Sequence, residues 1–305
     1  MSAPERVPPG GVTPPETVGE TATALAHGEL TVHGRIPDAS NGVLYCTVHH
    51  EGRRLPCVYK PVRAERPLWD FPDGTLAERE VAAYEVSEAT GWHLIPTTVL
   101  RDGPFGRGMC QAWVGPSPHE EADPPPDRGS GPAADRGVSL LGPAGEAGLL
   151  ALVDGEEPEP GWKAVGLAAT GEGRTALLVH RDDARLRRLA VLDAVINNGD
   201  RKGRHLLPAG DRLYGIDHGV SFHTDDKLRT LLWGWAGEPL PEEALRVLRR
   251  LAAGLADGAP LAARLGELLT AAELAALRRR VARLLDTGRH PLPGGDWPAI
   301  PWPPV

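Results

Sequence analysis

Two features in the first third of the sequence carry residue types that suit phosphate binding. Lys60 closes the apolar segment LPCVYKP and follows by one segment a turn that contains Ser40, Asn41 and Gly42. A lysine at the end of an apolar strand, beside a turn that offers backbone N–H groups, is an arrangement suited to phosphate. Glu80 comes next, in a segment where helical spacing could turn it toward the strands together with Tyr84.

Two loops in the second half of the sequence carry carboxylates beside apolar segments. Asp200 belongs to LDAVINNGDRKGRHLL, which crowds polar side chains between two apolar stretches. Asp217 belongs to YGIDHGVSF, where it follows an apolar triplet and precedes His218 and Gly219. Two such loops could together hold one or two divalent cations, because these ions prefer oxygen ligands.

Each of these features also has an ordinary structural explanation. A lysine at a strand end commonly extends its ammonium group into solvent. A helical glutamate is commonly exposed, and Asp or Asn in a turn commonly caps the backbone. The combination therefore supports a functional site more strongly than any single residue does.

The elements before residue 115 are expected to be mostly strands. Residues 28–61 alternate apolar and polar side chains in three segments separated by turns, which predicts three strands. If Glu51 and Gly52 form a two-residue hairpin turn, Cys46 lies opposite Cys57. Residues 76–91 predict a helix that ends at Gly91. Two further strands are expected on either side of the turn near residue 105.

The elements after residue 137 are expected to be mostly helices. Asp182 could cap a helix that presents Leu186, Leu189, Leu192 and Val195 on one face. Residues 211–223 then suggest a strand, a tight turn and a second strand. Three helices follow near residues 242–255, 261–269 and 271–285, and Thr270 with Glu273 forms a capping box for the last.

These patterns divide the chain into five parts. A proline-rich disordered tail is expected over residues 1–26, and a Trp/Pro tail in an extended conformation over residues 291–305. A strand-rich part covers 27–114 and a helical part covers 138–290. Between them, residues 115–137 consist of Pro, Gly and charged residues and predict a flexible loop.

The composition limits the classes of partner. The chain has 305 residues and a formal net charge of −8, so it would not attract nucleic acid or an anionic membrane over long range. A small basic pocket remains compatible with this balance. Three cysteines are too few for a disulfide framework, so free thiols are expected. Neither a signal peptide nor an apolar span is present, which predicts a cytoplasmic monomer.

The order lysine, glutamate, aspartate, aspartate is the order of the functional parts of kinases. On VYKP, EVAAY, LDAVINNGDR and IDHG, the sequence resembles the phosphatidylinositol 3-/4-kinase-like family of the protein-kinase-like superfamily. The similarity is to its short actinobacterial branch and, distantly, to type II lipid 4-kinases and HipA-type kinases. It spans roughly residues 28–304. It implies an α+β, two-lobed protein-kinase-like fold with a strand-rich N-lobe and a mainly helical C-lobe.

The resemblance also implies roles, with ATP and Mg²⁺ or Mn²⁺ as cofactors. Lys60 would hold the α and β phosphates, Glu80 would pair with Lys60, and Asp217 would bind the metal. Asp200, with Arg201 beside it, would orient or deprotonate the hydroxyl of a small-molecule or protein acceptor. The remaining nucleotide contacts would come from the turn and from the adenine hinge, namely Ser40, Asn41, Gly42, Gln111, Ala112, Trp113 and Val114.

One departure from the family pattern leaves other functions open. His205 stands where the family has a metal-binding Asn, and imidazole is a poorer ligand for Mg²⁺ than oxygen is. The chain could therefore be a kinase, or a pseudokinase that binds nucleotide and acts as an interaction module. A metallohydrolase using His205, His218 and His223 is less compatible, because the last two would point to opposite faces of a strand.

Overall fold

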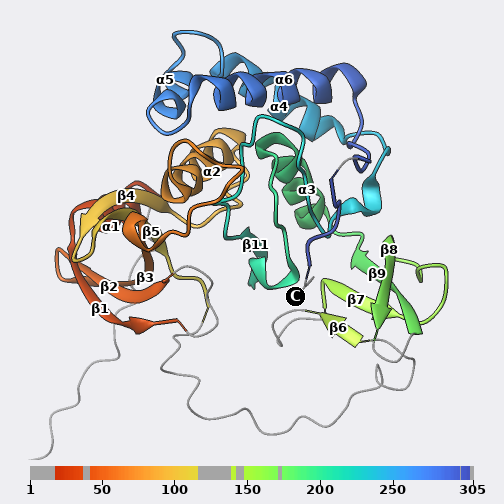
Figure 1. The fold of residues 1–305 in the computed structure, drawn as a ribbon, viewed down its shortest axis with the longest axis horizontal. Coiled ribbons are helices and arrows are strands. Elements are labelled where there is room, and N and C mark those ends of the chain that lie inside the picture. Colours follow the sequence, from red (N-terminus) through yellow and green to blue (C-terminus); the bar gives the residue numbers. More distant parts are fainter. Residues whose placement is uncertain are drawn as a thin grey trace, which may run out of the picture.

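The first lobe is built on a five-stranded antiparallel sheet in the order β1-β2-β3-β5-β4. A computed structural model describes residues 18–36, 42–115, 139–141, 148–170, 174–295 and 297–302. The strands are β1 Glu29–Arg35, β2 Leu44–His50, β3 Arg53–Pro61, β4 Thr98–Gly103 and β5 Gly106–Ala112. Two helices, α1 Val18–His27 and α2 Leu76–Thr90, pack against this sheet (Figure 1).

The β2–β3 hairpin has the register that the sequence predicts. Glu51 and Gly52 both have positive φ, 48° and 77°, as a tight two-residue turn requires. Cys46 consequently pairs with Cys57, and the two thiols stay free together with that of Cys110. This hairpin fixes where β3 ends and thus where Lys60 lies.

Helix α2 is specified at both ends by its sequence. Thr75 and Glu78 form a capping box at the start, and Gly91 ends the helix with a φ of 72°. The helix contacts β4 and β5 on one side and α4 and α5 on the other, so its residues are buried around most of the circumference. It therefore joins the two lobes.

The predicted tail over residues 1–26 is wrong for its last nine residues, because α1 begins at Val18. The prolines of this region end at Pro15, and the segment VGETATALAH can form a helix. Its Leu25 is fully buried in the core of the first sheet. Arg101 donates to the carbonyls of Leu25 and Gly28, at 2.8 and 2.9 Å, which satisfies the end of the helix. Residues 1–17 lie outside the described part.

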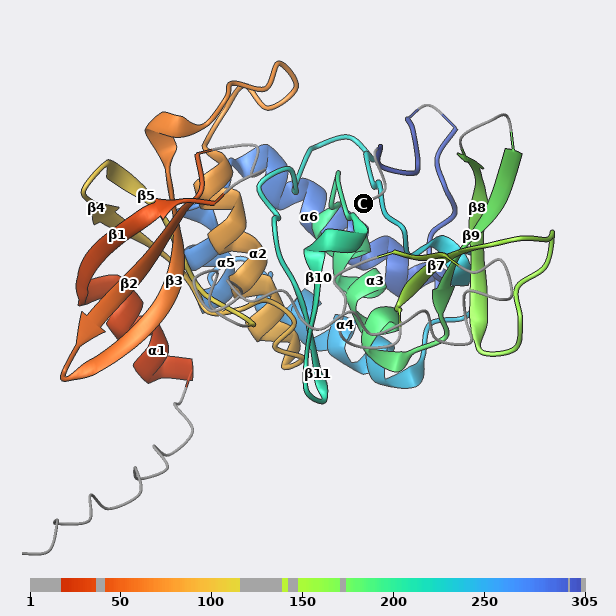
Figure 2. The same ribbon diagram turned by 90° about the horizontal axis from the view of Figure 1, so that it is seen from below.

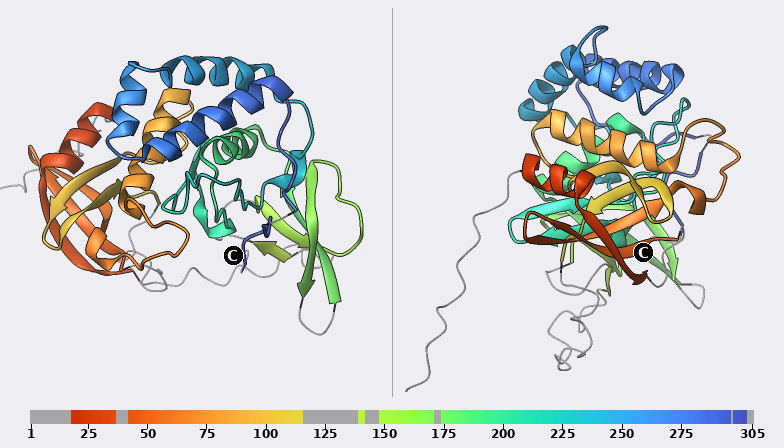
Figure 3. Two further views of the ribbon diagram at one scale, coloured as in Figure 1. Left: turned by 45° about the horizontal axis from the view of Figure 1, so that its top comes forward. Right: turned by 90° about the vertical axis from the view of Figure 1, so that its left-hand side faces the viewer.

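The second lobe combines helices with a four-stranded antiparallel sheet. Its helices are α3 Ala184–Ile196, α4 Glu242–Gly254, α5 Pro260–Gly266 and α6 Ala271–Thr287. The sheet has the order β6-β7-β9-β8. Its strands are β6 Ser139–Leu141, β7 Leu150–Val153, β8 Trp162–Thr170 and β9 Arg174–Arg181, and a hairpin pairs β10 Leu206–Ala209 with β11 Arg212–Gly215. The two sheets lie at opposite ends of the molecule, with α2 and α3 between them (Figures 1 and 3).

Three local expectations for the second lobe can be compared with the structure. The capping box of Thr270 and Glu273 is confirmed at the start of α6. The cap of α3 is Asp183 rather than Asp182, whose carboxylate instead accepts a hydrogen bond from the indole of Trp235. No strand follows Asp217 in the described chain, because positive φ values at Asp217 and Phe222 interrupt the extended conformation.

The cores of the two lobes are continuous through α2. One cluster of buried apolar side chains includes Val81 and Val86 of α2, Leu189 and Ile196 of α3, and residues of α4 and α6. A smaller cluster in the first sheet surrounds Leu25 and Tyr59. The expected α+β class, with a strand-rich first lobe and a mainly helical second lobe, is thus confirmed.

Two of the predicted irregular segments are described only in part. Most of the expected loop at 115–137 lies outside the described residues. In the C-terminal segment Ile300 packs on the main core, whereas Trp302 is exposed. Among the described helices, none has the length and apolar character that a membrane span needs.

Candidate active site

Lys60 is the centre of an ion-pair cluster at the junction of the lobes. It lies near the end of β3, and its Nζ is 2.7 Å from Glu80 Oε1 and 2.9 Å from Asp217 Oδ1. Glu80 comes from α2 and Asp217 from the loop after β11, so three elements that are distant in the sequence contribute one side chain each. Figure 2 shows β3, α2 and the β10–β11 hairpin side by side.

Glu80 and Asp217 are each held in place by local geometry. Glu80 is buried, and its second oxygen accepts a hydrogen bond from the backbone N–H of His218 at 2.8 Å. Asp217 has a φ of 63°, which is uncommon for a residue with a side chain and typical of constrained functional positions. Gly219 follows so close to α2 that an added Cβ would lie 3.1 Å from the Cβ of Leu76.

A cavity of about 100 Å³ connects this cluster with Asp200. Lys60, Glu80, Asp200 and Asp217 all line it, together with Glu65 and residues at the start of α2. The structure thus brings together the four residues that the sequence singles out. Glu65 was not predicted, and it accepts hydrogen bonds from the backbone N–H groups of Leu76 and Ala77, both at 2.9 Å.

The charges in the cluster support one another. Burial alone would lower the pKa of Lys60, but the carboxylates of Asp217 and Glu80 outweigh it and raise that pKa. The Lys60 ammonium in turn holds the pKa of Asp217 well below its usual range. Lys60 and Asp217 are therefore both ionised at neutral pH, and the carboxylate of Asp217 could also hold a cation.

Asp200 is positioned by the loop that follows α3. The helix ends at Asn197 in the left-handed conformation, and Asn198 Oδ1 accepts a hydrogen bond from the Asp200 N–H at 3.0 Å. Lys202 Nζ lies 3.0 Å from Asp200 Oδ2. Burial nevertheless raises the pKa of Asp200. Lys202 was missed at the sequence level, although its place two residues after Asp200, inside a polar loop between apolar segments, could have indicated it.

Arg201, which the sequence predicts as a catalytic residue beside Asp200, has a completely buried side chain. Its guanidinium group donates to both carboxylate oxygens of Asp193, at 3.0 and 2.9 Å, and to the carbonyl of Ile216 at 2.9 Å. These contacts tie the Asp200 loop to α3 and to the backbone beside Asp217. Arg201 is thus a positioning residue that cannot contact a substrate.

His205 lies beside Asp217 but is oriented as a donor. Its Nε2 is 3.4 Å from Asp217 Oδ2, and its Nδ1 accepts from the Lys202 N–H at 3.4 Å. Burial lowers the pKa of His205 to about 4, so the ring is neutral. A neutral ring that accepts at Nδ1 carries its proton on Nε2. In this tautomer His205 donates toward Asp217 and offers no lone pair to a metal there.

The site has few ligands for a metal ion. Within the described residues, no group of three or more His, Cys, Asp or Glu side chains could hold one. A metallohydrolase centre of the usual kind is built on such a group. The finding is compatible with Mg²⁺ in a nucleotide site, where one or two carboxylates and the phosphates of the substrate are the usual ligands. Asp217 is the side chain that fits this arrangement.

The predicted adenine hinge is partly engaged in the fold. The N–H groups of Ala112 and Trp113 donate to the carbonyls of Thr97 and Pro56, at 2.9 and 3.0 Å. The amide of Gln111 is buried and donates to Thr98 Oγ1. These donors are therefore not available to a base, which leaves the other groups of residues 111–114 as candidates.

The predicted phosphate turn is described only at its last residue. Ser40 and Asn41 lie outside the described residues. Gly42 has a φ of 48°, and an added Cβ would lie 2.9 Å from the Cβ of Ala64. Both facts require glycine at this position, which is consistent with a tight turn next to the segment that follows Lys60.

The fold of this chain is kinase-like. The solved structure of hydra Fam20 with sugar has a TM-score of 0.51 and 13% identity, and the match covers 88% of this chain and 87% of that one. A Golgi casein kinase with Mn/ADP bound matches with a TM-score of 0.48, 12% identity, and 88% and 75% coverage. The finer resemblance to phosphatidylinositol 3-/4-kinases stays a prediction.

Protein Rv2133c of Mycobacterium tuberculosis (strain ATCC 25618 / H37Rv) is 49% identical over 282 residues. The match covers 92% of this chain and 93% of that protein, so the chain belongs to the same family as protein Rv2133c. No family model matches the sequence.

Proposed function

We propose that this protein is an ATP-dependent phosphotransferase that transfers a phosphoryl group to a hydroxyl acceptor, either a small molecule or a protein. The observation that carries the proposal is the contact of one lysine, Lys60, with both the buried Glu80 and the loop residue Asp217. This is the arrangement by which kinases hold the phosphates of ATP and the metal ion.

In the proposed mechanism each side chain has a separate task. Lys60 binds the α and β phosphates and is held in position by Glu80. Asp217 would hold a divalent cation, Mg²⁺ or Mn²⁺, and His205 orients the second oxygen of Asp217. A cation held by Asp217 would offset negative charge on the phosphates during transfer.

Asp200 accepts the proton of the acceptor hydroxyl as the phosphoryl group is transferred. Burial raises the pKa of Asp200, which makes its carboxylate a stronger base at neutral pH. Lys202 Nζ, 3.0 Å from Asp200 Oδ2, keeps that carboxylate oriented. Arg201 anchors the Asp200 loop to α3 through the carboxylate of Asp193.

The charges in the segment after Asp217 indicate which kind of acceptor the protein could bind. Of its two cations, Lys227 is paired with Asp70 at 3.0 Å, and Arg229 hydrogen bonds to the carbonyl of Ile300 at 3.5 Å. Asp225 and Asp226 lie in the same segment. A phosphoinositide headgroup would be poorly matched by this balance of charge, so a neutral hydroxyl acceptor is favoured.

A pseudokinase is the second candidate, and the orientation of His205 is the observation that favours it. Where the related kinases have an amide that coordinates a second metal, this chain has an imidazole that donates toward Asp217. A protein of that kind would bind nucleotide without turning it over. Binding and turnover must therefore be measured separately.

The binding experiment is a calorimetric titration of ADP, with and without Mn²⁺ or Mg²⁺, into the full chain. We expect metal-dependent binding that Lys60→Met weakens about 10- to 100-fold, because hydrogen bonds to charged groups contribute about 1.5–3 kcal/mol. Lys163→Met is the matched control, since Lys163 lies in β8 and pairs with Glu238. Absence of ADP binding in the unmodified chain would exclude both the kinase and the nucleotide-binding pseudokinase.

A further inference from the structure

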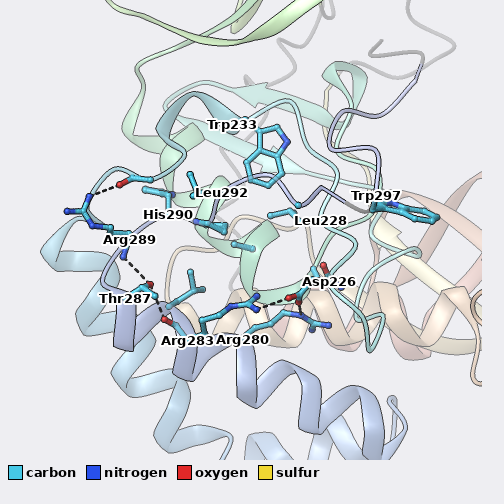
Figure 4. A pocket seen from close by; sticks show the side chains of 16 residues that line it. Asp226, Leu228, Trp233, Arg280, Arg283, Thr287, Arg289, His290, Leu292 and Trp297 are labelled. Atoms are coloured by element: carbon cyan, nitrogen blue, oxygen red, sulfur yellow. Dashed lines mark hydrogen bonds and ion pairs between the residues drawn. The ribbon is translucent and has the colours of Figure 1, made fainter.

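A second and larger cavity, of about 390 Å³, lies in the second lobe (Figure 4). Its walls come from α3, α6, the segment after Asp217 and the C-terminal segment. Lys60, Glu80, Asp200 and Asp217 do not line it, so it is separate from the proposed active site. Its volume falls within the range of about 300–1,000 Å³ that is common for small-molecule sites.

The charge in this cavity is positive, although the chain as a whole carries −8. Among the described residues that line it, three are arginines, Arg280, Arg283 and Arg289, and Asp226 is the one carboxylate. Asp226 lies 2.7 Å from Arg283 Nη1 and 3.6 Å from Arg280 Nε. The carboxylate of Asp226 is thus shared between two guanidinium groups and cannot neutralise both of them.

Arg280 forms the back of the cavity and is incompletely partnered. Its side chain is 4% exposed, and one nitrogen, Nη2, donates to the carbonyl of His223. Neither Nε nor Nη1 has a hydrogen-bond partner. Burial lowers the pKa of Arg280 to about 10, which shows that its surroundings offset the charge only in part. A buried cation in this condition is stabilised by an additional anion nearby.

The other walls of the cavity are apolar or aromatic. Trp233 and Trp297 lie on the wall facing Arg280 and Arg283, with Leu228 between the two indoles and Leu292 beside His290 (Figure 4). The indole Nε1 of Trp297 is buried without a hydrogen-bond partner. The cavity therefore offers apolar surface, one unused indole donor and a guanidinium edge.

We propose that this cavity binds a small organic anion, with a phosphate or carboxylate group on an apolar or aromatic body. The anionic group contacts Arg283, whose side chain is 55% exposed, and it offsets the charge of Arg280 behind it. Guanidinium groups suit both phosphate and carboxylate because their planar N–H donors match two oxygens. The body of the ligand packs between the tryptophans.

The test is a calorimetric titration of four probes into the full chain: phenyl phosphate, benzoate, inorganic phosphate and benzyl alcohol. We expect phenyl phosphate or benzoate to bind at one site, at least 10-fold more tightly than inorganic phosphate or the neutral alcohol. The tighter of the two organic anions identifies the preferred headgroup. Arg283→Gln should weaken that binding at least 10-fold, whereas Arg279→Gln should not, because Arg279 is an exposed residue of α6 outside the cavity.

Competition distinguishes this cavity from the active site. Saturating ADP with Mn²⁺ should leave the binding of the organic anion unchanged. Displacement by ADP would assign the probe to the active site and overturn the proposal. The proposal also fails if neither organic anion binds, or if Arg283→Gln binds as tightly as the unmodified chain. These results do not depend on whether the protein turns over ATP.

Discussion

At the scale of single residues, the proposed activity depends on how Lys60 is held. A lysine that pairs with one carboxylate could take several rotamers, whereas Lys60 is fixed between a buried glutamate and a constrained aspartate. The fixed ammonium is oriented before nucleotide binds, so little conformational entropy remains to be lost.

Replacing Glu80 by Gln tests this positioning. The change removes one negative charge next to Lys60, so we expect the rate of ATP turnover to fall about 10- to 100-fold, in line with the loss of a charge-assisted hydrogen bond. Glu88→Gln is the control, since Glu88 is on the same helix and contacts His93. Equal rates for the two variants would show that the Lys60–Glu80 pair has no catalytic importance.

The four central residues could be predicted because each marks the end of an apolar segment or a helical position facing the sheet. The roles of their neighbours could not. The burial of Arg201 depends on Asp193, eight residues earlier, and on the carbonyl of Ile216, fifteen residues later. The orientation of His205 depends on the N–H of Lys202. Such contacts follow from the folded loop and have no pattern in the sequence.

At the scale of elements, α2 determines whether Glu80 reaches Lys60. Arg79, next to Glu80, pairs with Glu273 of α6 at 2.7 Å, and both side chains are buried. Arg79 also lies over the ring of Phe71. This contact fixes the start of α2 to the second lobe.

Replacing one partner of this buried ion pair should lower the stability of the fold. Arg79→Met leaves the carboxylate of Glu273 without its partner, and we expect the free energy of unfolding in urea to fall by about 3–5 kcal/mol. The exposed pair of Arg249 and Glu242 provides the comparison, and Arg249→Met should cost less than about 1 kcal/mol. A loss below about 1 kcal/mol for Arg79→Met would contradict the proposed role of α2.

The unpredicted sheet of the second lobe contains a histidine that should make stability depend on pH. His180 is buried in the neutral form: its Nδ1 is 2.8 Å from the carbonyl of Arg181, and its Nε2 accepts from the Gly234 N–H at 3.0 Å. Burial lowers its pKa to about 4, against about 6.5 when unfolded. Protonation therefore favours the unfolded chain.

Because the pKa of His180 is lower in the folded chain than in the unfolded chain, stability falls as the pH falls. The contribution of His180 to stability is complete above about pH 6.5 and is lost as the pH falls toward 4. We expect His180 alone to contribute on the order of 2 kcal/mol to the decrease in the free energy of unfolding between pH 7 and pH 5. His180→Gln should show a clearly smaller decrease, and an unchanged decrease would assign the effect to other groups.

The sequence predicted helices and strands correctly where local signals were strong, as at the ends of α2 and α6. The predictions were wrong or incomplete where tertiary contacts determine the structure. Helix α1 has few apolar residues and depends on Leu25 reaching the sheet. Strand β8 contains Gly166, and both β8 and β9 have only short apolar runs, so the sequence had no alternation clear enough to indicate their pairing.

At the scale of the whole molecule, the continuous core holds the candidate active-site residues of both lobes at fixed positions relative to one another. Lys60 comes from the first lobe, Asp200 and Asp217 come from the second, and α2 belongs to the core shared by both. Phosphoryl transfer needs these groups at fixed separations, because catalysis consists mainly of positioning and charge stabilisation. The arginine-lined cavity lies apart from them in the second lobe.

The most direct test of the central claim is the formation of ADP from ATP with Mg²⁺ or Mn²⁺ by the unmodified chain and by Asp200→Asn. We predict measurable turnover that falls by about 10²- to 10⁴-fold in the variant, the range for loss of a general base. Asp211→Asn, an exposed aspartate in the β10–β11 turn, should turn over ATP like the unmodified chain. Turnover that survives Asp200→Asn unchanged, or no turnover by the unmodified chain with either metal, would contradict the phosphotransferase assignment.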